Sequence, residues 1–306
     1  MNPVQPASRS GPGAWPYGST RVAAVIGSPV RHSLSPVLHN AAFHAVGLDW
    51  AYVAFEVAEG AVPAALDGMR ALGIRGMSVT MPHKAAVAAA VDRIEPAAAA
   101  LGSVNCVTNR DGVLHGRNTD GEGFLRGLAA ETGLDVSGRR VVVFGAGGAA
   151  RAVILAVAQA GAADIAVVNR SIDRAVAAAS LAGATGRVGT TQDVVAADLV
   201  INATPIGMAG TPAANNLPFS PRNIRPGQYV ADLVYHPLRT PLLVAVSSLG
   251  GVVVTGIGML VHQAALAFES WTGITAPIEA MNIAILKHLA RSDDDFRTAI
   301  EDVPVK

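Results

Sequence analysis

The chain contains very few of several residue types, and each shortage excludes a class of protein. Cys106 is the only cysteine among 306 residues, so a disulfide framework and a cysteine-based zinc site are excluded. The 23 basic residues are balanced by 23 acidic ones, so no basic excess points to nucleic acid. Gly, Pro or a charge interrupts every apolar run before the roughly 18 residues that a membrane span requires. We therefore expect neither a membrane segment nor a nucleic-acid partner.

The remaining composition is that of a globular protein with a large core. Hydrophobic residues make up 51% of the chain and charged residues only 15%, and the length favours two domains. Residues 1–20 are rich in Pro, Gly and Ser and lack the apolar centre of a signal peptide. We interpret this segment as a disordered extension and expect a cytoplasmic protein.

Residues 141–151 combine an apolar strand pattern, a glycine turn and an alanine-rich helical pattern. Gly145, Gly147 and Ala150 fit the G-x-G-x-x-G/A pattern of dinucleotide-binding loops. The first glycine permits the tight turn, the second lets a pyrophosphate approach the backbone, and Ala150 lets the helix pack closely on the strand. The N-terminus of the helix then binds the anion. The alternative is a glycine-rich turn that binds no ligand.

The end of the next predicted strand indicates which dinucleotide is bound. An NAD site usually carries an acidic residue about 20 residues past the glycines, where it binds the ribose 2′-hydroxyl. This chain instead has Asn169, Arg170 and Ser171, followed by Arg174. Two guanidinium groups can bind a 2′-phosphate bidentately, so the sequence favours NADP. The alternative is that both arginines are solvated residues of a helix surface.

Strand and helix patterns alternate from residue 21, which predicts an α/β fold with mainly parallel sheets. Arg110-Asp111-Gly112 is a hairpin turn pattern. Expected strands are 22–27, 51–57, 76–80, 104–109, 113–116, 141–145, 164–168, 198–202, 229–234 and 251–255. Expected helices are 36–46, 62–72, one from about Pro82, 119–132, one after each of the strands 141–145 and 164–168, 258–271 and 277–290. We predict two domains: 21–121 with 258–291 forms an N-terminal α/β substrate domain, and 122–257 a Rossmann-type NADP-binding domain. The C-terminal helices would return to the first domain.

Lysine is a further scarce residue and occurs only at positions 84, 287 and 306. Lys84 lies at a predicted strand–helix junction, where sites of α/β proteins form. A lysine, unlike an arginine, can release a proton. Asp120 is the candidate carboxylate beside it. The alternative is that Thr119 and Glu122 form a capping box with Asp120 in the first helical turn.

The segment 33–40 also has two interpretations. Ser35 is expected to cap a helix that begins with Pro36, and His39 to lie on the face of that helix. His39 and His44 are five residues apart, which is poor spacing for a metal pair on one helix face. We predict no metal site.

Taken in order, these motifs resemble those of the shikimate/quinate dehydrogenase family over about residues 21–290. The matching segments are Ser33-Leu-Ser-Pro with His39-Asn40, Val79-Thr-Met-Pro-His-Lys84, Gly102-Ser-Val-Asn105, Gly116-Arg-Asn-Thr-Asp120, Gly145-Ala-Gly-Gly-Ala-Ala-Arg151, Asn169-Arg-Ser171, Asn202-Ala-Thr-Pro-Ile-Gly-Met208, Asp232-Leu-Val-Tyr235 with Pro237 and Thr240, and Gly256-Ile-Gly-Met-Leu-Val-His-Gln263 followed by Trp271-Thr-Gly273. The resemblance implies reversible, NADP-dependent reduction of 3-dehydroshikimate to shikimate, in chorismate and aromatic amino-acid biosynthesis. It also implies a cleft that excludes water when it closes.

The resemblance further implies a role for each matching residue. Lys84 and Asp120 would form the catalytic pair. The implied substrate-binding residues are Ser33, Ser35 and Tyr235 for the carboxylate, and Thr80, Asn105 and Gln263 for the ring hydroxyls. The implied cofactor-binding residues are Gly145, Gly147, Gly148 and Ala149 for the pyrophosphate, Asn169, Arg170, Ser171 and Arg174 for the adenosine phosphate, and Thr204, Met208, Gly256 and Met259 for the nicotinamide.

The chain departs from the family pattern at three positions. Ser78 stands where Asn is common, His83 where an aromatic residue is common, and Ser171 where Thr is usual. We expect altered loop bonding at Ser78 and a peripheral place for His83. The alternative functions are an NAD-dependent quinate, shikimate or aminoshikimate dehydrogenase, and a non-catalytic nucleotide sensor, which Lys84 and Asp120 oppose. We expect a small-molecule substrate as the partner, and the sequence does not decide whether the protein forms a homodimer.

Overall fold

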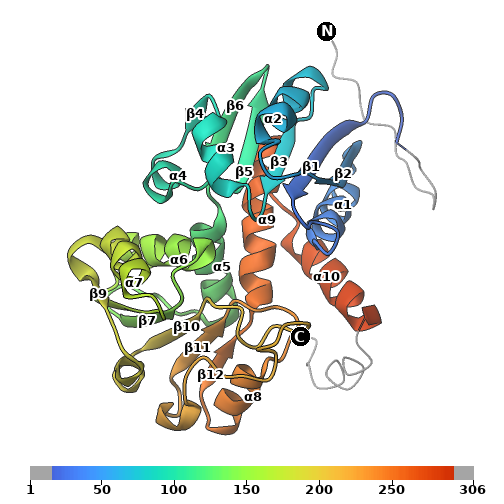
Figure 1. Cartoon of the computed structure of the whole chain (residues 1–306). Coiled ribbons are helices and arrows are strands. Elements are labelled where there is room, and N and C mark those ends of the chain that lie inside the picture. Colours follow the sequence, from blue (N-terminus) through green and yellow to red (C-terminus); the bar gives the residue numbers. More distant parts are fainter. Residues whose placement is uncertain (1–15, 293–306) are drawn as a thin grey trace. The chain divides into compact units, whose positions relative to one another are not determined.

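The structure is a computed structural model that describes residues 16–292. The described chain forms two compact units (Figure 1). The first comprises residues 16–95, 104–117 and 264–292, and the second comprises 96–103 and 118–263. Each unit contains its own six-stranded sheet. Residues 1–15 of the predicted extension lie outside the described residues.

The first unit is built on a mixed sheet with the strand order β2-β1-β3-β5-β6-β4. β1, β2 and β3 run parallel, while β5 runs antiparallel to both β3 and β6. Its elements are β1 (Arg21–Gly27), α1 (Ser35–Ala45), β2 (Trp50–Glu56), α2 (Val62–Ala71), β3 (Gly76–Val79), α3 (Lys84–Ala90), β4 (Arg93–Ile94), β5 (Cys106–Arg110), β6 (Val113–Arg117) and α10 (Ile278–Ser292). The helix α9 (Gly256–Thr272) contributes its last turns to this unit.

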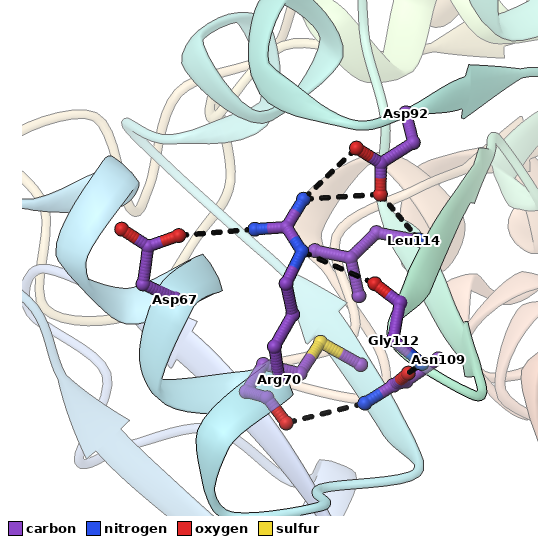
Figure 2. A network of polar contacts seen from close by, with 7 residues as sticks. Asp67, Arg70, Asp92, Asn109, Gly112 and Leu114 are labelled. Atoms are coloured by element: carbon purple, nitrogen blue, oxygen red, sulfur yellow. Dashed lines mark hydrogen bonds and ion pairs between the residues drawn. The ribbon is translucent and has the colours of Figure 1, made fainter.

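The predicted hairpin between β5 and β6 is confirmed. Asp111 and Gly112 both have positive φ, at 52° and 89°, as a two-residue Asp-Gly turn requires. A polar network ties this hairpin to α2 (Figure 2). Arg70 donates to both carboxylate oxygens of Asp92 (3.1 and 3.0 Å) and to the Gly112 carbonyl (3.2 Å). Asn109 donates to two backbone carbonyls (3.2 and 3.1 Å) and accepts the Gly112 N–H (2.8 Å).

The last turns of α9 and all of the described α10 belong to the first unit, so the C-terminal helices return to it. α10 packs against α1. Trp271, at the end of α9, donates its indole N–H to the Val107 carbonyl in β5 (3.0 Å). The indole lies so close to β3 that a Cβ at Gly76 would overlap it. His39 stacks on Tyr52 at 4.3 Å between ring centroids, so it is a core residue and is not exposed on the helix face.

The second unit is built on a fully parallel sheet with the order β12-β11-β10-β7-β8-β9. Read from β9, this is the doubly wound order 3-2-1-4-5-6, in which the winding reverses between β7 and β10. Its elements are α4 (Pro96–Leu101), α5 (Asp120–Thr132), β7 (Arg140–Phe144), α6 (Gly148–Gln159), β8 (Asp164–Val168), α7 (Ile172–Ala179), β9 (Gly186–Val188), β10 (Leu199–Asn202), β11 (Tyr229–Asp232), α8 (Pro241–Ser248), β12 (Val252–Val254), the first turns of α9, and 3-10 turns at Ser180–Thr185, Thr191–Val195 and Pro221–Asn223.

Both faces of this parallel sheet are buried. Val141 and Val143 of β7 belong to one apolar core, while Val142 and Phe144 belong to the core on the opposite face. Alternate residues of a strand point to opposite faces, so an unbroken apolar run is what a doubly covered strand requires. The Rossmann-type prediction is therefore confirmed for this unit.

Candidate active site

The carboxyl ends of β1 and β3 lie beside the start of β5, because β5 runs antiparallel to β3. Val79, at the end of β3, donates its N–H to the Asn105 carbonyl (2.8 Å). Thr80 donates its N–H to a carbonyl of β1 (3.0 Å), and the Lys84 carbonyl accepts the Val104 N–H (3.0 Å). Thr80, Lys84 and Asn105 therefore lie together at one edge of the first sheet, where β1 and β3 end and β5 begins.

Two serines of the predicted site lie between the end of β1 and the first turn of α1. Ser35 is the first residue of α1, and the N-cap is Leu34, which makes no side-chain cap bond. The prediction that Ser35 caps the helix is therefore wrong, because Leu34 already has near-helical dihedral angles (φ −86°, ψ −5°). The Ser33 Oγ instead accepts the Ser35 N–H (3.3 Å). Both serines are half-buried.

Lys84 is the first residue of α3, which begins two residues later than expected because His83 occupies the N-cap. Lys84 is half-buried. His83, expected to be peripheral, is 2% exposed, and its Nε2 lies 2.8 Å from the Val57 carbonyl oxygen. Since a carbonyl only accepts, Nε2 carries the proton. His83 thereby ties the junction that presents Lys84 to the segment after β2.

Asp120 begins α5 in the second unit and is only 6% exposed. Its backbone N–H donates to the Asn118 Oδ1 (3.0 Å). The alternative interpretation, a capping box, is wrong, because Thr119 makes no side-chain cap bond and Glu122 pairs with Arg126 (2.7 Å). A carboxylate buried to this degree requires polar partners. Asp120 is therefore not a solvated acid of a helix surface.

The helices α5 and α9 approach so closely that glycine is required between them. A Cβ at Gly123 would lie 2.6 Å from the backbone nitrogen of Gln263, and a Cβ at Gly127 would lie 2.5 Å from the Gly258 carbonyl carbon. Gly123 lies one turn after Asp120 on the same helix face. This packing brings the first turn of α5 next to Gln263, whose Nε2 donates to a carbonyl one turn earlier (2.8 Å).

Glu131, in the last turn of α5, caps the start of α9. One carboxylate oxygen accepts the Thr255 N–H (3.0 Å) and the other accepts the Thr255 hydroxyl (3.2 Å). Burial raises the pKa of Glu131, and these hydrogen bonds oppose that rise. The cap fixes the helical turn that carries Gly256 and Met259.

The glycine loop has the geometry that the fingerprint predicts. Gly145 has φ +112°, and a Cβ there would lie 2.8 Å from the Ala203 carbonyl oxygen. Gly147 is the N-cap of α6 and Gly148 its first residue, and apart from chain neighbours and the backbone of α6 no atom lies within 4 Å of a Cβ placed at either. Ala149 is half-buried, and Ala150 is fully buried against the sheet. The loop therefore leaves open space at the start of α6, as a pyrophosphate requires.

The turn after β8 presents its two arginines to solvent. Ser171 is the N-cap of α7, and its Oγ accepts the Arg174 N–H (3.4 Å). Asn169 donates to the Ser171 carbonyl (3.1 Å). Arg170 and Arg174 are exposed, and Asp173 lies in the same first turn. The turn is thus ordered by its polar side chains and leaves both guanidinium groups accessible.

Thr204 follows β10, the strand beside β7. Its hydroxyl donates to the Asn202 Oδ1 (2.6 Å) and accepts the Ile206 N–H (3.2 Å). Its methyl carbon lies 3.3 Å from the position of a Cβ at Gly145. Met208 is half-buried in the same loop. Since both functions of the hydroxyl are used within the turn, the methyl group is the part of Thr204 that faces the glycine loop.

Tyr235, Gly256 and Met259 complete this end of the second sheet. Tyr235 follows β11, and burial raises its pKa. A Cβ at Gly256 would lie 2.6 Å from the Leu233 carbonyl oxygen, so the start of α9 requires glycine. Met259 packs against the core on one face of the sheet. All the predicted cofactor residues of this unit thus follow β7, β8, β10 or β12, at the carboxyl ends of the strands.

Sequence reasoning gave no role to three polar residues that the structure joins. Asn202, Asp232 and Thr240 are completely buried and hydrogen-bonded to one another. The sequence feature that could have identified this group is an acidic residue, Asp232, at the end of an apolar strand.

Across residues 16–292, no helix has the length and apolarity to cross a bilayer, and no group of three His, Cys, Asp or Glu side chains is arranged for a metal ion.

Three family models match this chain in order. The shikimate dehydrogenase substrate binding domain matches residues 25–107, shikimate/quinate 5-dehydrogenase matches 127–208, and the shikimate 5′-dehydrogenase C-terminal domain matches 256–286. A shikimate dehydrogenase (NADP(+)) from Moorella thermoacetica is 46% identical over 284 residues, covering 90% of this chain and 95% of the relative.

Solved structures agree with these sequence matches. A shikimate dehydrogenase in complex with NADP+ has a TM-score of 0.86 and 37% identity, covering 91% of this chain and 99% of its own. The Thermus thermophilus enzyme in complex with NADP(H) and shikimate has a TM-score of 0.80 and 37% identity, covering 87% and 98%. The chain therefore belongs to the shikimate dehydrogenase family.

Proposed function

We propose that this protein catalyses the reversible, NADP-dependent reduction of 3-dehydroshikimate to shikimate, a step of aromatic amino-acid biosynthesis. The observation that carries the proposal is the grouping of the motif residues. Thr80, Lys84 and Asn105 lie together at one edge of the first sheet. The glycine loop and the Thr204 loop meet where the winding of the second sheet reverses. Nucleotide cofactors bind at this point in doubly wound folds.

The residues around the glycine loop fit NADP. Gly147 and Gly148 leave room at the N-terminus of α6 for the pyrophosphate, and Arg170 and Arg174 are accessible to the 2′-phosphate. In this proposal Ala149 supports the pyrophosphate, Asn169 and Ser171 shape the arginine turn, and Thr204, Met208, Gly256 and Met259 line the nicotinamide. When bound, the reduced cofactor supplies a hydride to the substrate ketone.

The proposed chemistry of the chain itself is proton transfer and positioning. The Lys84 ammonium stabilises the negative charge that develops on the ketone oxygen and donates the proton to it. Asp120 orients Lys84 and accepts a hydrogen bond from a substrate hydroxyl. The remaining proposed contacts are Ser33, Ser35 and Tyr235 with the carboxylate, and Thr80, Asn105 and Gln263 with the ring hydroxyls.

The experiment that tests the proposal compares two substrates with two cofactors. We expect kcat/KM for shikimate with NADP+ to exceed the values for shikimate with NAD+ and for quinate with either cofactor. A preference for quinate with NAD+ would contradict the proposal, and binding of NADP+ without turnover of either substrate would indicate a nucleotide sensor.

Location and assembly complete the proposal. We expect a cytoplasmic enzyme that acts on a small-molecule substrate, with a homodimer as one possible assembly. Light scattering of the purified full-length chain measures the mass in solution and decides between a monomer and a dimer.

A further inference from the structure

Asp232 is the centre of a buried polar network at the carboxyl end of the second sheet. Asp232 ends β11 and Asn202 ends β10, and the two residues are paired in register. Asp232, Asn202 and Thr240 are each 0% exposed. None of the three has a role in the chemistry proposed above, although each belongs to a motif of the sequence.

Every partner of the Asp232 carboxylate is a neutral donor. Oδ1 accepts the Asn202 Nδ2–H (2.9 Å) and the Val234 N–H (3.1 Å). Oδ2 accepts the Thr240 hydroxyl (2.6 Å). Burial raises the pKa of Asp232, and the three hydrogen bonds oppose that rise. Because an ionised carboxylate only accepts, it can satisfy all three donors at once.

The three donors come from the end of β10 and from the two ends of the loop between β11 and α8. Asn202 passes the constraint to Thr204, because its Oδ1 accepts both the N–H (3.1 Å) and the hydroxyl (2.6 Å) of Thr204. Val234 immediately precedes Tyr235. Thr240 is the N-cap of α8, where its Oγ accepts the Leu243 N–H (3.3 Å). One side chain therefore fixes the loop after β10, the loop after β11 and the start of α8.

The Thr204 loop in turn contacts the glycine loop. The Ala203 carbonyl and the Thr204 methyl are the nearest atoms to the missing side chain of Gly145, at 2.8 and 3.3 Å. A displacement of Asn202 is thus transmitted over two residues to the turn that would hold the dinucleotide.

We propose that Asp232 is a positioning residue, which sets the Thr204 and Tyr235 loops against the glycine loop for binding of the cofactor's nicotinamide end and the substrate. The inference rests on the proposed function for the identity of those ligands. Asp232 touches neither ligand in this proposal and acts through Asn202, Val234 and Thr240.

The first test is Asp232→Asn. The amide of Asn has one accepting oxygen and one donating nitrogen, so at least one of the three donors loses its acceptor. Loss of about one hydrogen bond from the bound state corresponds to a rise in the Kd of NADP+ of roughly fivefold. We also expect a higher KM for shikimate. Val234, whose N–H donates to Asp232, immediately precedes Tyr235, a proposed contact of the substrate carboxylate.

The matched control is Asn109→Ala in the β5–β6 hairpin (Figure 2). Asn109 is buried and also makes three hydrogen bonds, but it lies outside the proposed machinery. We expect this variant to lose stability and to keep the NADP+ Kd and both KM values of the wild type. A second pair, Thr240→Val and Thr240→Ser, removes and restores the hydroxyl donor. We expect a raised Kd for Val and a wild-type Kd for Ser.

The outcomes separate this inference from the proposed function. The substrate preference of the wild type tests the proposed function. The role of Asp232 is tested separately, by the ratio of the variant Kd to the wild-type Kd for whichever cofactor the wild type binds. This ratio is measured without turnover. If Asp232→Asn does not fold, the Thr240 pair decides. An unchanged Kd in the folded variants, or an equal rise in Asn109→Ala, would overturn the inference.

Discussion

Gly145→Ala tests whether the conformation of the glycine loop depends both on the positive φ of Gly145 and on its close approach to the Thr204 loop. Gly145 has φ +112°, a conformation that residues with a side chain rarely adopt, and the added carbon would lie 2.8 Å from the Ala203 carbonyl oxygen. Backbone strain of this kind costs on the order of 1–3 kcal/mol. Relief requires movement of either the turn or the Thr204 loop, and both line the proposed cofactor site.

We expect the free energy of unfolding to fall by about 1–3 kcal/mol and the Kd of NADP+ to rise by roughly five- to 100-fold. Urea denaturation measures the first quantity and calorimetric titration the second. The control is Gly68→Ala in the interior of α2, where no atom beyond the neighbouring backbone of the helix lies within 4 Å of the added carbon. This change should stabilise the protein by roughly 0.5–1 kcal/mol. Unchanged stability and unchanged NADP+ affinity in Gly145→Ala would refute the reasoning.

Three further variants test separate parts of the site. Arg170→Ala should raise the KM for NADP+ by about tenfold and leave the KM for NAD+ nearly unchanged, because only NADP+ carries the 2′-phosphate; equal changes in the two KM values would contradict this role. Glu131→Ala removes the cap of α9 and should cost about 0.5–2 kcal/mol in urea denaturation, with Glu131→Gln closer to wild type; equal losses would argue against the cap. Asp232→Asn should be most destabilising at acid pH. The raised pKa of Asp232 means that the wild type loses stability as pH rises through that pKa, whereas the variant does not. If the stability lost in Asp232→Asn, relative to the wild type, instead increased as the pH rises from about 4 to about 7, this prediction would be wrong.

Local sequence patterns predicted the parts of the fold that depend on local geometry. The Asp111-Gly112 turn and the glycine loop require positive φ, and both appear where the sequence indicated. The apolar run at 141–145 correctly indicated β7, a strand that the structure buries on both faces. These features depend on a few neighbouring residues, so one sequence is sufficient to recognise them.

Elements stabilised by distant contacts were missed. β4 and β9 contain two and three residues, too few for a periodic pattern. The start of α8 is uniformly apolar, Pro241-Leu-Leu-Val, a run that does not distinguish a helix from a buried strand. The capping box at Thr119 had the right residue types, but the Asn118 side chain accepts the Asp120 N–H and Glu122 pairs with Arg126.

The candidate site shows the same division. Lys84 and the glycines were recognisable from residue type and position. Asp232 was not, because its importance comes from partners that the chain supplies at three other positions and that only the folded sheet brings together.

The most direct test of the proposed chemistry is the turnover of Lys84→Ala with 3-dehydroshikimate and NADPH, measured together with its Kd for NADP+. Lys287→Ala, an exposed lysine of α10, is the matched control. We predict that kcat falls by about 10²- to 10⁴-fold in Lys84→Ala, while its NADP+ Kd and the kcat of Lys287→Ala stay near the wild-type values. A near-normal kcat in Lys84→Ala would contradict the assignment of Lys84 as the proton donor.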